Sequence, residues 1–154
     1  MTGSPDRGAS VHVRRARIEE IRPLAEAYRD ESSRDTAPSE PPQPAGGIFW
    51  IAEEPDGGEP LGYAGGTLRP GGLTIGPVYV RPASRRRRIG VQLLGEVQRW
   101  AARTRIPVVE VSVAVENDEG RAFLEACGYM PRRILFSPTP EARPDAPAVV
   151  ADTR

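Results

Sequence analysis

The chain has 154 residues and a mass of 16.7 kDa, enough for one compact hydrophobic core and too short for two ordinary domains. Its 21 basic residues, all arginine, balance 21 acidic residues, and this zero net charge argues against nucleic acid or an anionic membrane as the main partner. A single cysteine, Cys127, excludes an intrachain disulfide, and a single histidine, His12, argues against a metal site.

Composition divides the chain into one domain and several low-complexity segments. Residues 1–10 and 137–154 are rich in proline, alanine and charge, so we expect flexible tails around a single domain at 11–136. Residues 31–47 form a similar stretch inside the domain, and a loop of that length is usually functional or disordered. Because no apolar run is long enough for a membrane span and the N-terminus lacks a signal-peptide core, we expect a cytoplasmic protein.

Apolar periodicity within the domain alternates between the spacing of strands and that of helices. In chain order it predicts a strand at 11–16, a helix at 17–29, strands at 47–54, 61–69 and 73–80, a helix at 89–103, a strand at 108–115, a short helix after Asn117 and a strand at 132–136. A helical crossover makes the strands before and after the helix at 89–103 parallel. The pattern therefore predicts a mixed α/β (α+β) fold with helices flanking a central sheet.

Two local features refine these elements. Gly76-Pro77 lies inside the strand at 73–80, and because proline donates no hydrogen bond, we expect a bulge or bend there. Asn117 is a favourable N-cap with Asp118 and Glu119 in the first turn after it, and Gly128 suits the left-handed end of that helix.

The most informative stretch runs from an apolar strand through four consecutive arginines, Arg85 to Arg88, directly into a helix at Ile89. The first N–H groups of a helix have no intrahelical partner, and the helix dipole favours an anion at this end. A strand that delivers a cationic loop to a helix N-terminus is therefore suited to binding phosphate. A solvated basic loop is the alternative interpretation of the arginine run alone.

Two motifs in this order resemble those of the GNAT family of N-acetyltransferases. Residues 85–90, RRRRIG, are similar to the family's acetyl-CoA-binding pattern Arg/Gln-x-x-Gly-x-Gly/Ala. Residues 117–129, NDEGRAFLEACGY, resemble its second motif, in which Asn begins a helix that Gly and an aromatic residue close. The resemblance implies a GNAT-like, strongly twisted sheet whose central parallel strands splay apart to admit the pantetheine arm of acetyl-CoA.

The resemblance also implies cofactor-binding roles. Backbone groups of Val78, Tyr79 and Val80 would pair with pantetheine like an added strand, and Asn117 would contact pantetheine or its cysteamine end. Leu124 stands where many members place a tyrosine that protonates the departing thiolate. The pyrophosphate would be held by backbone N–H groups of Arg86, Arg87, Arg88, Ile89, Gly90 and Val91.

The sequence departs from the family at two of these positions. Arg88 replaces the usual glycine, and if the position needs a positive φ, an arginine costs on the order of 1 kcal/mol, which a guanidinium–phosphate pair would offset. Leu124 cannot donate a proton. Water or another group would then protonate the thiolate, or a thiolate of pKa about 8–9 would leave without an acid.

The catalytic base and acid stay open at this stage. Glu110 lies on the polar face of the strand at 108–115 and is our candidate base, with an ion pair to an arginine as its alternative role. Tyr79 is a candidate replacement for the missing tyrosine, with core packing as the alternative. Phe49 and Trp50 alternate on one strand, so we expect one in the core and the other facing an acceptor cleft.

Three functional hypotheses follow. The first is an N-acetyltransferase that transfers an acetyl group from acetyl-CoA, without a metal, to a primary amine of a small molecule or a protein or peptide by direct attack. Acidic Glu31, Asp35 and Glu40 would attract that cationic amine. The second is a CoA-binding domain without catalysis, acting as a sensor or scaffold. The third, a nucleic-acid-binding module, is disfavoured by the zero net charge. The acceptor, and whether the chain forms a homodimer, stay open.

Overall fold

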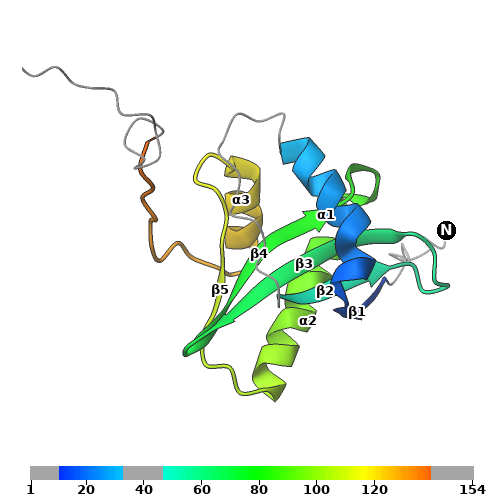
Figure 1. Cartoon of the computed structure of the whole chain (residues 1–154), viewed down its shortest axis with the longest axis horizontal. Helices are drawn as coiled ribbons and strands as arrows, with labels where there is room; N and C mark the ends of the chain where they lie inside the picture. Colours follow the sequence, from blue (N-terminus) through cyan, green and yellow to red (C-terminus); the bar gives the residue numbers. More distant parts are fainter. Residues whose placement is uncertain (1–10, 33–46, 140–154) are drawn as a thin grey trace, which may run out of the picture.

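The computed structural model of this protein describes residues 11–32 and 47–139 (Figure 1). In chain order its elements are β1 (His12–Ala16), α1 (Ile18–Ser32), β2 (Ile48–Glu53), β3 (Pro60–Arg69), β4 (Gly72–Val80), a short 3₁₀ turn (Pro82–Ser84), α2 (Ile89–Arg103), β5 (Val109–Val111) and α3 (Asp118–Ala126). The predicted tail at 1–10, most of the tail at 137–154, and the loop residues Asp35 and Glu40 lie outside the described residues.

The strands form one mixed sheet in the order β1-β2-β3-β4-β5. The first three pairings are antiparallel, and β4 pairs with β5 in parallel. Helix α1 packs on one face of the sheet and α2 on the other, as Figure 1 shows. This architecture confirms the predicted fold class, and α2 has the bounds predicted from its apolar stripe.

Side chains of β2 alternate between two hydrophobic clusters, one on each face of the sheet. Phe49 packs with α1 residues such as Leu24, whereas Trp50 packs with α2 residues such as Leu93. Phe49 is 3% exposed and Trp50 is fully buried, so the prediction that one of them faces a cleft is wrong. Helices cover both faces of β2, which explains why its sequence is almost continuously apolar.

Strand β4 contains an extra residue at Gly76-Pro77. Between its pairs with Gly66 and Ala64 of β3, β4 has two residues opposite the single Gly65. This register shift confirms the bulge predicted from the missing N–H of proline. The extra residue reverses the direction in which all following side chains and backbone groups of β4 point.

The parallel pairing of β4 with β5 is short. It extends over three residue pairs, the last being Ile75 with Val111, and Ser112 N–H then donates to the Ile75 carbonyl at 2.7 Å. The predicted strand at 108–115 is therefore too long, since β5 covers only Val109–Val111. Because β4 bulges directly after Ile75, residues past Ser112 have no ladder to join. The two parallel strands diverge toward their carboxyl ends.

The strand predicted at 132–136 does not form. Residues 130–139 contain no helix or strand, and the part of the chain that the structure describes places no strand beside them. A strand needs a hydrogen-bonding neighbour, and apolar composition alone does not supply one. Among the helices of the described residues, none has the length and apolar character needed to cross a membrane.

Candidate functional site

Val78 and Val80 present backbone groups to the gap between the diverging strands. Arg81 N–H donates to the Leu61 carbonyl of β3 at 2.8 Å, and backbone groups alternate in direction along a strand. By this alternation Tyr79 faces β3, while Val78 and Val80 face the side that β5 has left. Of the three residues predicted to pair with pantetheine, only these two valines have backbone groups on the open side, and the Val80 carbonyl already accepts a hydrogen bond from Arg85 there.

The four-arginine loop gathers backbone N–H groups at the start of α2. Arg86 and Arg88 have φ angles of 69° and 59°, in the left-handed region. Arg88 therefore has the positive φ that was considered for this position, where the family usually has glycine. When left-handed residues alternate with residues of other backbone conformation, successive N–H groups point to the same side and can together bind an anion. The Arg88 side chain makes no hydrogen bond that caps α2. The first N–H of the helix that donates to a preceding backbone carbonyl is that of Gln92, which donates to the Arg88 carbonyl at 3.2 Å. Residues 89–91 therefore keep N–H groups without intrahelical partners.

Two of the four arginine side chains fasten the loop to the body of the protein. Arg85 donates to the Val80 carbonyl at 3.0 Å and pairs with Glu31 of α1 at 2.7 Å. Arg87 forms a bidentate pair with Glu54 at 2.8 and 3.2 Å, and this guanidinium lowers the pKa of the Glu54 carboxyl. These contacts hold the loop's main chain in place without occupying its N–H groups.

The other two, Arg86 and Arg88, are exposed and form no ion pair with another described residue. Arg88 borders a cavity of about 450 Å³ between α2 and the C-terminal end of α3. The cavity is lined by Arg88, Val91, Leu94, Gly95, Gln98 and residues 126–129. Arg88 and Val91 line the cavity and also belong to the segment at 86–91 that carries the unpaired N–H groups. The cavity therefore adjoins the N–H groups at the start of α2.

Gly90 allows α2 and α3 to approach each other closely beside this cavity. A Cβ at Gly90 would lie 2.9 Å from Cζ of Phe123, a distance that carbon atoms do not adopt in packed proteins. The glycine of the first motif therefore also serves helix packing, which the sequence alone did not reveal.

Helix α3 begins and ends as predicted. The Asn117 Oδ1 atom accepts a hydrogen bond from Gly120 N–H at 2.8 Å, and Gly128 has a φ of 88°. Leu124, 9% exposed, packs in the hydrophobic cluster on the α2 face, and Cys127 packs against the same cluster. The ligand contacts expected of Asn117 and Leu124 stay predictions.

Glu110, the candidate base, lies where β4 and β5 are still paired. Its Oε2 atom accepts from Arg69 at 2.5 Å and also contacts the Arg133 guanidinium. Arg69 is fixed in turn by a 3.0 Å hydrogen bond to Thr74. This is the ion pairing considered as the alternative for Glu110, and a role as base stays a prediction.

Tyr79 lies with Glu31 and Arg85 at the open end of the sheet. Its ring is 6% exposed and meets Tyr28 edge-on at a centroid distance of 5.6 Å, in agreement with core packing. Burial and, secondarily, the Glu31 carboxylate raise the pKa of the Tyr79 phenol. Sequence reasoning missed this cluster, because its members come from α1, β4 and the arginine loop and no spacing relates them.

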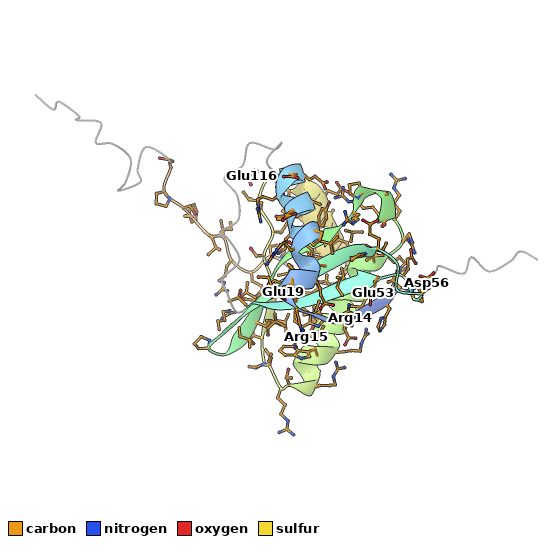
Figure 2. All side chains as sticks on the ribbon, turned by 45° about the vertical axis from the view of Figure 1, so that its right-hand side comes forward. Arg14, Arg15, Glu19, Glu53, Asp56 and Glu116 are labelled. Carbon is orange, nitrogen blue, oxygen red and sulfur yellow. The ribbon has the colours of Figure 1, made fainter. Side chains whose placement is uncertain are left out.

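A separate charged cluster joins β1, β2 and α1 at the opposite edge of the sheet. Arg14 donates to Glu53 at 2.7 Å and to Glu20 at 2.9 Å, and Figure 2 shows Arg14 and Glu53 side by side. We interpret this cluster as structural, because Arg14 pairs with both carboxylates and so links β1 to β2 and α1. Within the described ranges, no group of three or more His, Cys, Asp or Glu side chains is placed to hold a metal ion.

The fold and this site define a mixed α/β domain in which two parallel strands pair over a short stretch and a basic loop follows the first of them. The model of the Acetyltransferase (GNAT) family matches residues 15–129, and the chain belongs to this family. A comparison with curated protein sequences gives no match.

Solved structures with the same fold have low sequence identity to this chain. A Klebsiella pneumoniae protein provisionally described as an acyl-CoA N-acyltransferase is 21% identical, with a TM-score of 0.67 over 89% of this chain and 92% of its own. The aminoglycoside N-acetyltransferase AAC(6')-Iy in complex with CoA is 20% identical, with a TM-score of 0.62 over 83% of this chain and 98% of its own. An integron cassette protein of V. cholerae is 18% identical, with a TM-score of 0.65 over 84% and 92%. At these identities the likeness establishes the fold alone.

Proposed function

We propose that this protein is an N-acetyltransferase that transfers an acetyl group from acetyl-CoA to a primary amine of a small molecule or a peptide. The observation that carries the proposal is the succession of two backbone surfaces, the open edge at Val78 and Val80 and the N–H groups at 86–91. A ligand with an amide-containing arm and a pyrophosphate matches both surfaces. The arm pairs like an added strand, and the phosphates meet a helix N-terminus.

Acetyl-CoA supplies an acetyl group activated as a thioester. The chain contributes orientation: backbone groups of Val78 and Val80 align the arm, and the N–H groups at the start of α2 hold the phosphates. Arg86 and Arg88 add charge at that end, and charge-assisted hydrogen bonds to phosphate are stronger than neutral ones. Arg85 and Arg87 of the same loop already pair with Glu31 and Glu54. These ion pairs support the proposal, because they hold the main chain of the loop in position before a ligand binds.

The acceptor amine would approach from the α1 face, where Glu31 ends a helix. The Glu31 side chain is 40% exposed, and its carboxylate can attract a cationic amine even though Arg85 shares it. We assign Tyr79 as the candidate proton donor to the leaving thiolate in place of Leu124, because its phenol lies with Glu31 and Arg85 at the open end of the sheet. Burial raises its pKa, so this phenol is a weaker acid than an exposed tyrosine. Water on the open side of β4 would take the proton of the amine.

The proposal is tested on the full chain by thermal unfolding with acetyl-CoA and by thiol release with a panel of primary amines. We expect a higher Tm with acetyl-CoA and amine-dependent thiol release. Arg86→Ala together with Arg88→Ala should weaken both responses. Arg99→Ala with Arg103→Ala is the matched control, because these arginines of α2 pair with Glu96 away from the loop. No Tm change at millimolar acetyl-CoA would contradict the proposal.

A second candidate function is that of a CoA-binding sensor or scaffold without catalysis. It is favoured by the burial of Leu124 and by the engagement of Glu110 with Arg69 and Arg133. A Tm increase with acetyl-CoA and no thiol release across the panel would support it. If Glu110 is the base, Glu110→Gln lowers kcat and removes the acidic limb of the pH profile. If it only forms ion pairs, the variant lowers Tm and keeps the profile.

A further inference from the structure

A polar surface lies on the α1 side of the sheet, where β4 and β5 are still paired. Thr74 stands opposite Glu110 in this parallel pair. The residues on either side of Thr74, Leu73 and Ile75, are buried in the cluster on the α2 side, so Thr74 and Glu110 point to the α1 side. Thr67 of β3, opposite Thr74, is exposed, and Figure 1 shows this end of β3 and β4 extending beyond α1. Helix α1 therefore leaves this polar surface open to a ligand.

Two arginines share a single carboxylate on this polar surface. Arg69 and Arg133 both donate to Glu110 Oε2, and Arg69 Nε also donates to the Thr74 hydroxyl at 3.0 Å. Neither arginine has another ion pair among the described residues, so the surface carries one positive charge in excess. Glu110 Oε1 accepts no hydrogen bond within the described part of the chain. The side chains of Arg69 and Glu110 are 35% and 28% exposed, so a ligand can reach both the guanidinium and this oxygen.

The polar surface lies at the thioester end of the proposed acetyl-CoA site. The basic loop follows the carboxyl end of β4, so an arm that pairs with Val80 and then with Val78 runs back toward Gly76-Pro77. The pair of Thr74 with Glu110 comes two residues beyond Gly76, and a strand rises about 3.3 Å per residue, which places the pair about 7 Å from the bulge. An amine that reaches the thioester from the α1 side therefore meets this surface.

We propose that the acceptor is a free α-amino acid, whose carboxylate binds Arg69 and whose amino group binds Glu110 Oε1. The inference rests on the proposed N-acetyltransferase activity and names its substrate class. A single carbon separates the amine and the carboxylate of an α-amino acid, so the adjacent guanidinium and carboxylate complement both groups. A simple amine would leave the excess positive charge without a partner. Arg69 is held by Thr74 and Glu110 before a ligand binds, which lowers the entropy that binding costs.

The role of Arg69 in this reaction is to position the acceptor. The amine nitrogen attacks the thioester carbon, so that a C–N bond replaces the C–S bond. CoA leaves as a thiolate, and the amine loses one proton to water. Arg69 takes no part in this exchange of bonds, so its removal should raise KM for the amino acid more than it lowers kcat.

The first test measures thiol release by the full chain with acetyl-CoA and three matched sets of acceptors: the standard α-amino acids, their α-amides and their decarboxylated amines. We expect kcat/KM to be at least about tenfold higher for the preferred amino acid than for its amide. Arg69→Gln should abolish this preference by raising KM for the acid, and Arg69→Lys should retain part of it. Arg99→Gln is the matched control, because Arg99 pairs with Glu96 on α2. Equal rates with acids and amides would overturn the inference and leave the N-acetyltransferase activity standing.

The second test needs no turnover. Titration calorimetry in the presence of CoA compares N-acetyl amino acids with N-acetyl amino acid amides, and the acids should bind at least about tenfold more tightly. Arg133→Gln keeps the test decisive if Arg69→Gln fails to fold, because Arg133 lies outside every helix and strand; it should reduce the ratio severalfold. No difference between acids and amides, or no binding of either, would overturn the inference. A Tm that acetyl-CoA does not raise would instead refute the proposed function, and the inference with it.

Discussion

Arg88 combines a strained backbone with an exposed guanidinium, and two substitutions separate these properties. Its φ and ψ are 59° and 26°, a left-handed conformation that costs an L-residue about 1–2 kcal/mol. Glycine relieves this strain but gains about 0.4–1 kcal/mol of conformational freedom in the unfolded chain. Arg88→Gly should therefore raise the free energy of unfolding by about 0.5–1 kcal/mol, with Tm rising roughly 2–4 °C per kcal/mol in a domain of this size.

Arg88→Ala retains the strain and removes the charge, so the two variants should differ in stability and agree in binding. Denaturant unfolding should find the glycine variant more stable than the alanine variant. Titration calorimetry should find that both bind acetyl-CoA about three- to tenfold more weakly than the unmodified protein, since each lacks the guanidinium near the phosphates; tenfold is about 1.4 kcal/mol.

Arg105 provides the control within the same chain. It has a φ of 57° just beyond the C-terminal end of α2, far along the helix from the basic loop. Arg105→Gly should stabilise the protein as Arg88→Gly does and leave the affinity for acetyl-CoA unchanged. An Arg88→Gly variant no more stable than Arg88→Ala would refute the strain argument. Equal loss of affinity at Arg105 would show that net charge, and not position, governs binding.

Three further predictions concern the helices and the charged cluster at β1. Gly90→Ala places a Cβ against the half-buried Phe123 ring, and this clash opposes the roughly 1 kcal/mol by which alanine is favoured over glycine in a helix. Gly90→Ala should therefore be more favourable in a Phe123→Ala background than in the unmodified protein; urea unfolding of the double-mutant cycle measures this coupling, and equal effects in the two backgrounds would contradict the contact. Asn117→Ala should lower stability by about 1 kcal/mol, whereas Asn117→Asp, which keeps the cap, should hold the Tm; equal losses in thermal melts would argue against the cap. Arg14 lowers the pKa of Glu53, so its stabilisation is complete above the ordinary glutamate pKa and is lost as pH falls through the lowered value. Arg14→Met should thus lower Tm near neutral pH, with the difference closing in acid, and a constant difference across a pH series would contradict the linkage.

The sequence was a reliable guide where a covalent property decides the local structure. Proline lacks an N–H, so the bulge at Gly76-Pro77 could be predicted, and the apolar stripe of α2 fixed its bounds. Prediction from the sequence failed where a strand depends on a neighbouring strand to pair with. The alternating residues at 108–115 and the apolar residues at 132–136 both have strand-like patterns. Most of the first segment and all of the second lack a described strand to pair with.

The candidate site shows the same division. The order of strand, loop and helix predicted unpaired backbone N–H groups at the start of α2, and the structure has them at 89–91; phosphate binding there stays a prediction. The left-handed φ of Arg86 and Arg88 could not be predicted, because arginine does not favour it. Nor did spacing indicate that Arg85 and Arg87 pair with Glu31 and Glu54, which come from distant parts of the chain. Tertiary contacts determine which of the four arginines form ion pairs among the described residues.

Because of the bulge in β4, the direction of the backbone groups at Val78 and Val80 depends on the number of residues in the strand more than on their identity. The open edge at Val78 and Val80 consists of main-chain atoms, so another apolar side chain at either position would leave its hydrogen-bonding groups in place. Loss of a single codon at Gly76-Pro77 would shift the phase of the strand, turn those groups toward β3 and move Tyr79 into the opposite core. Substitutions between apolar residues at these positions would then be tolerated, while a one-residue deletion would remove the open edge of β4.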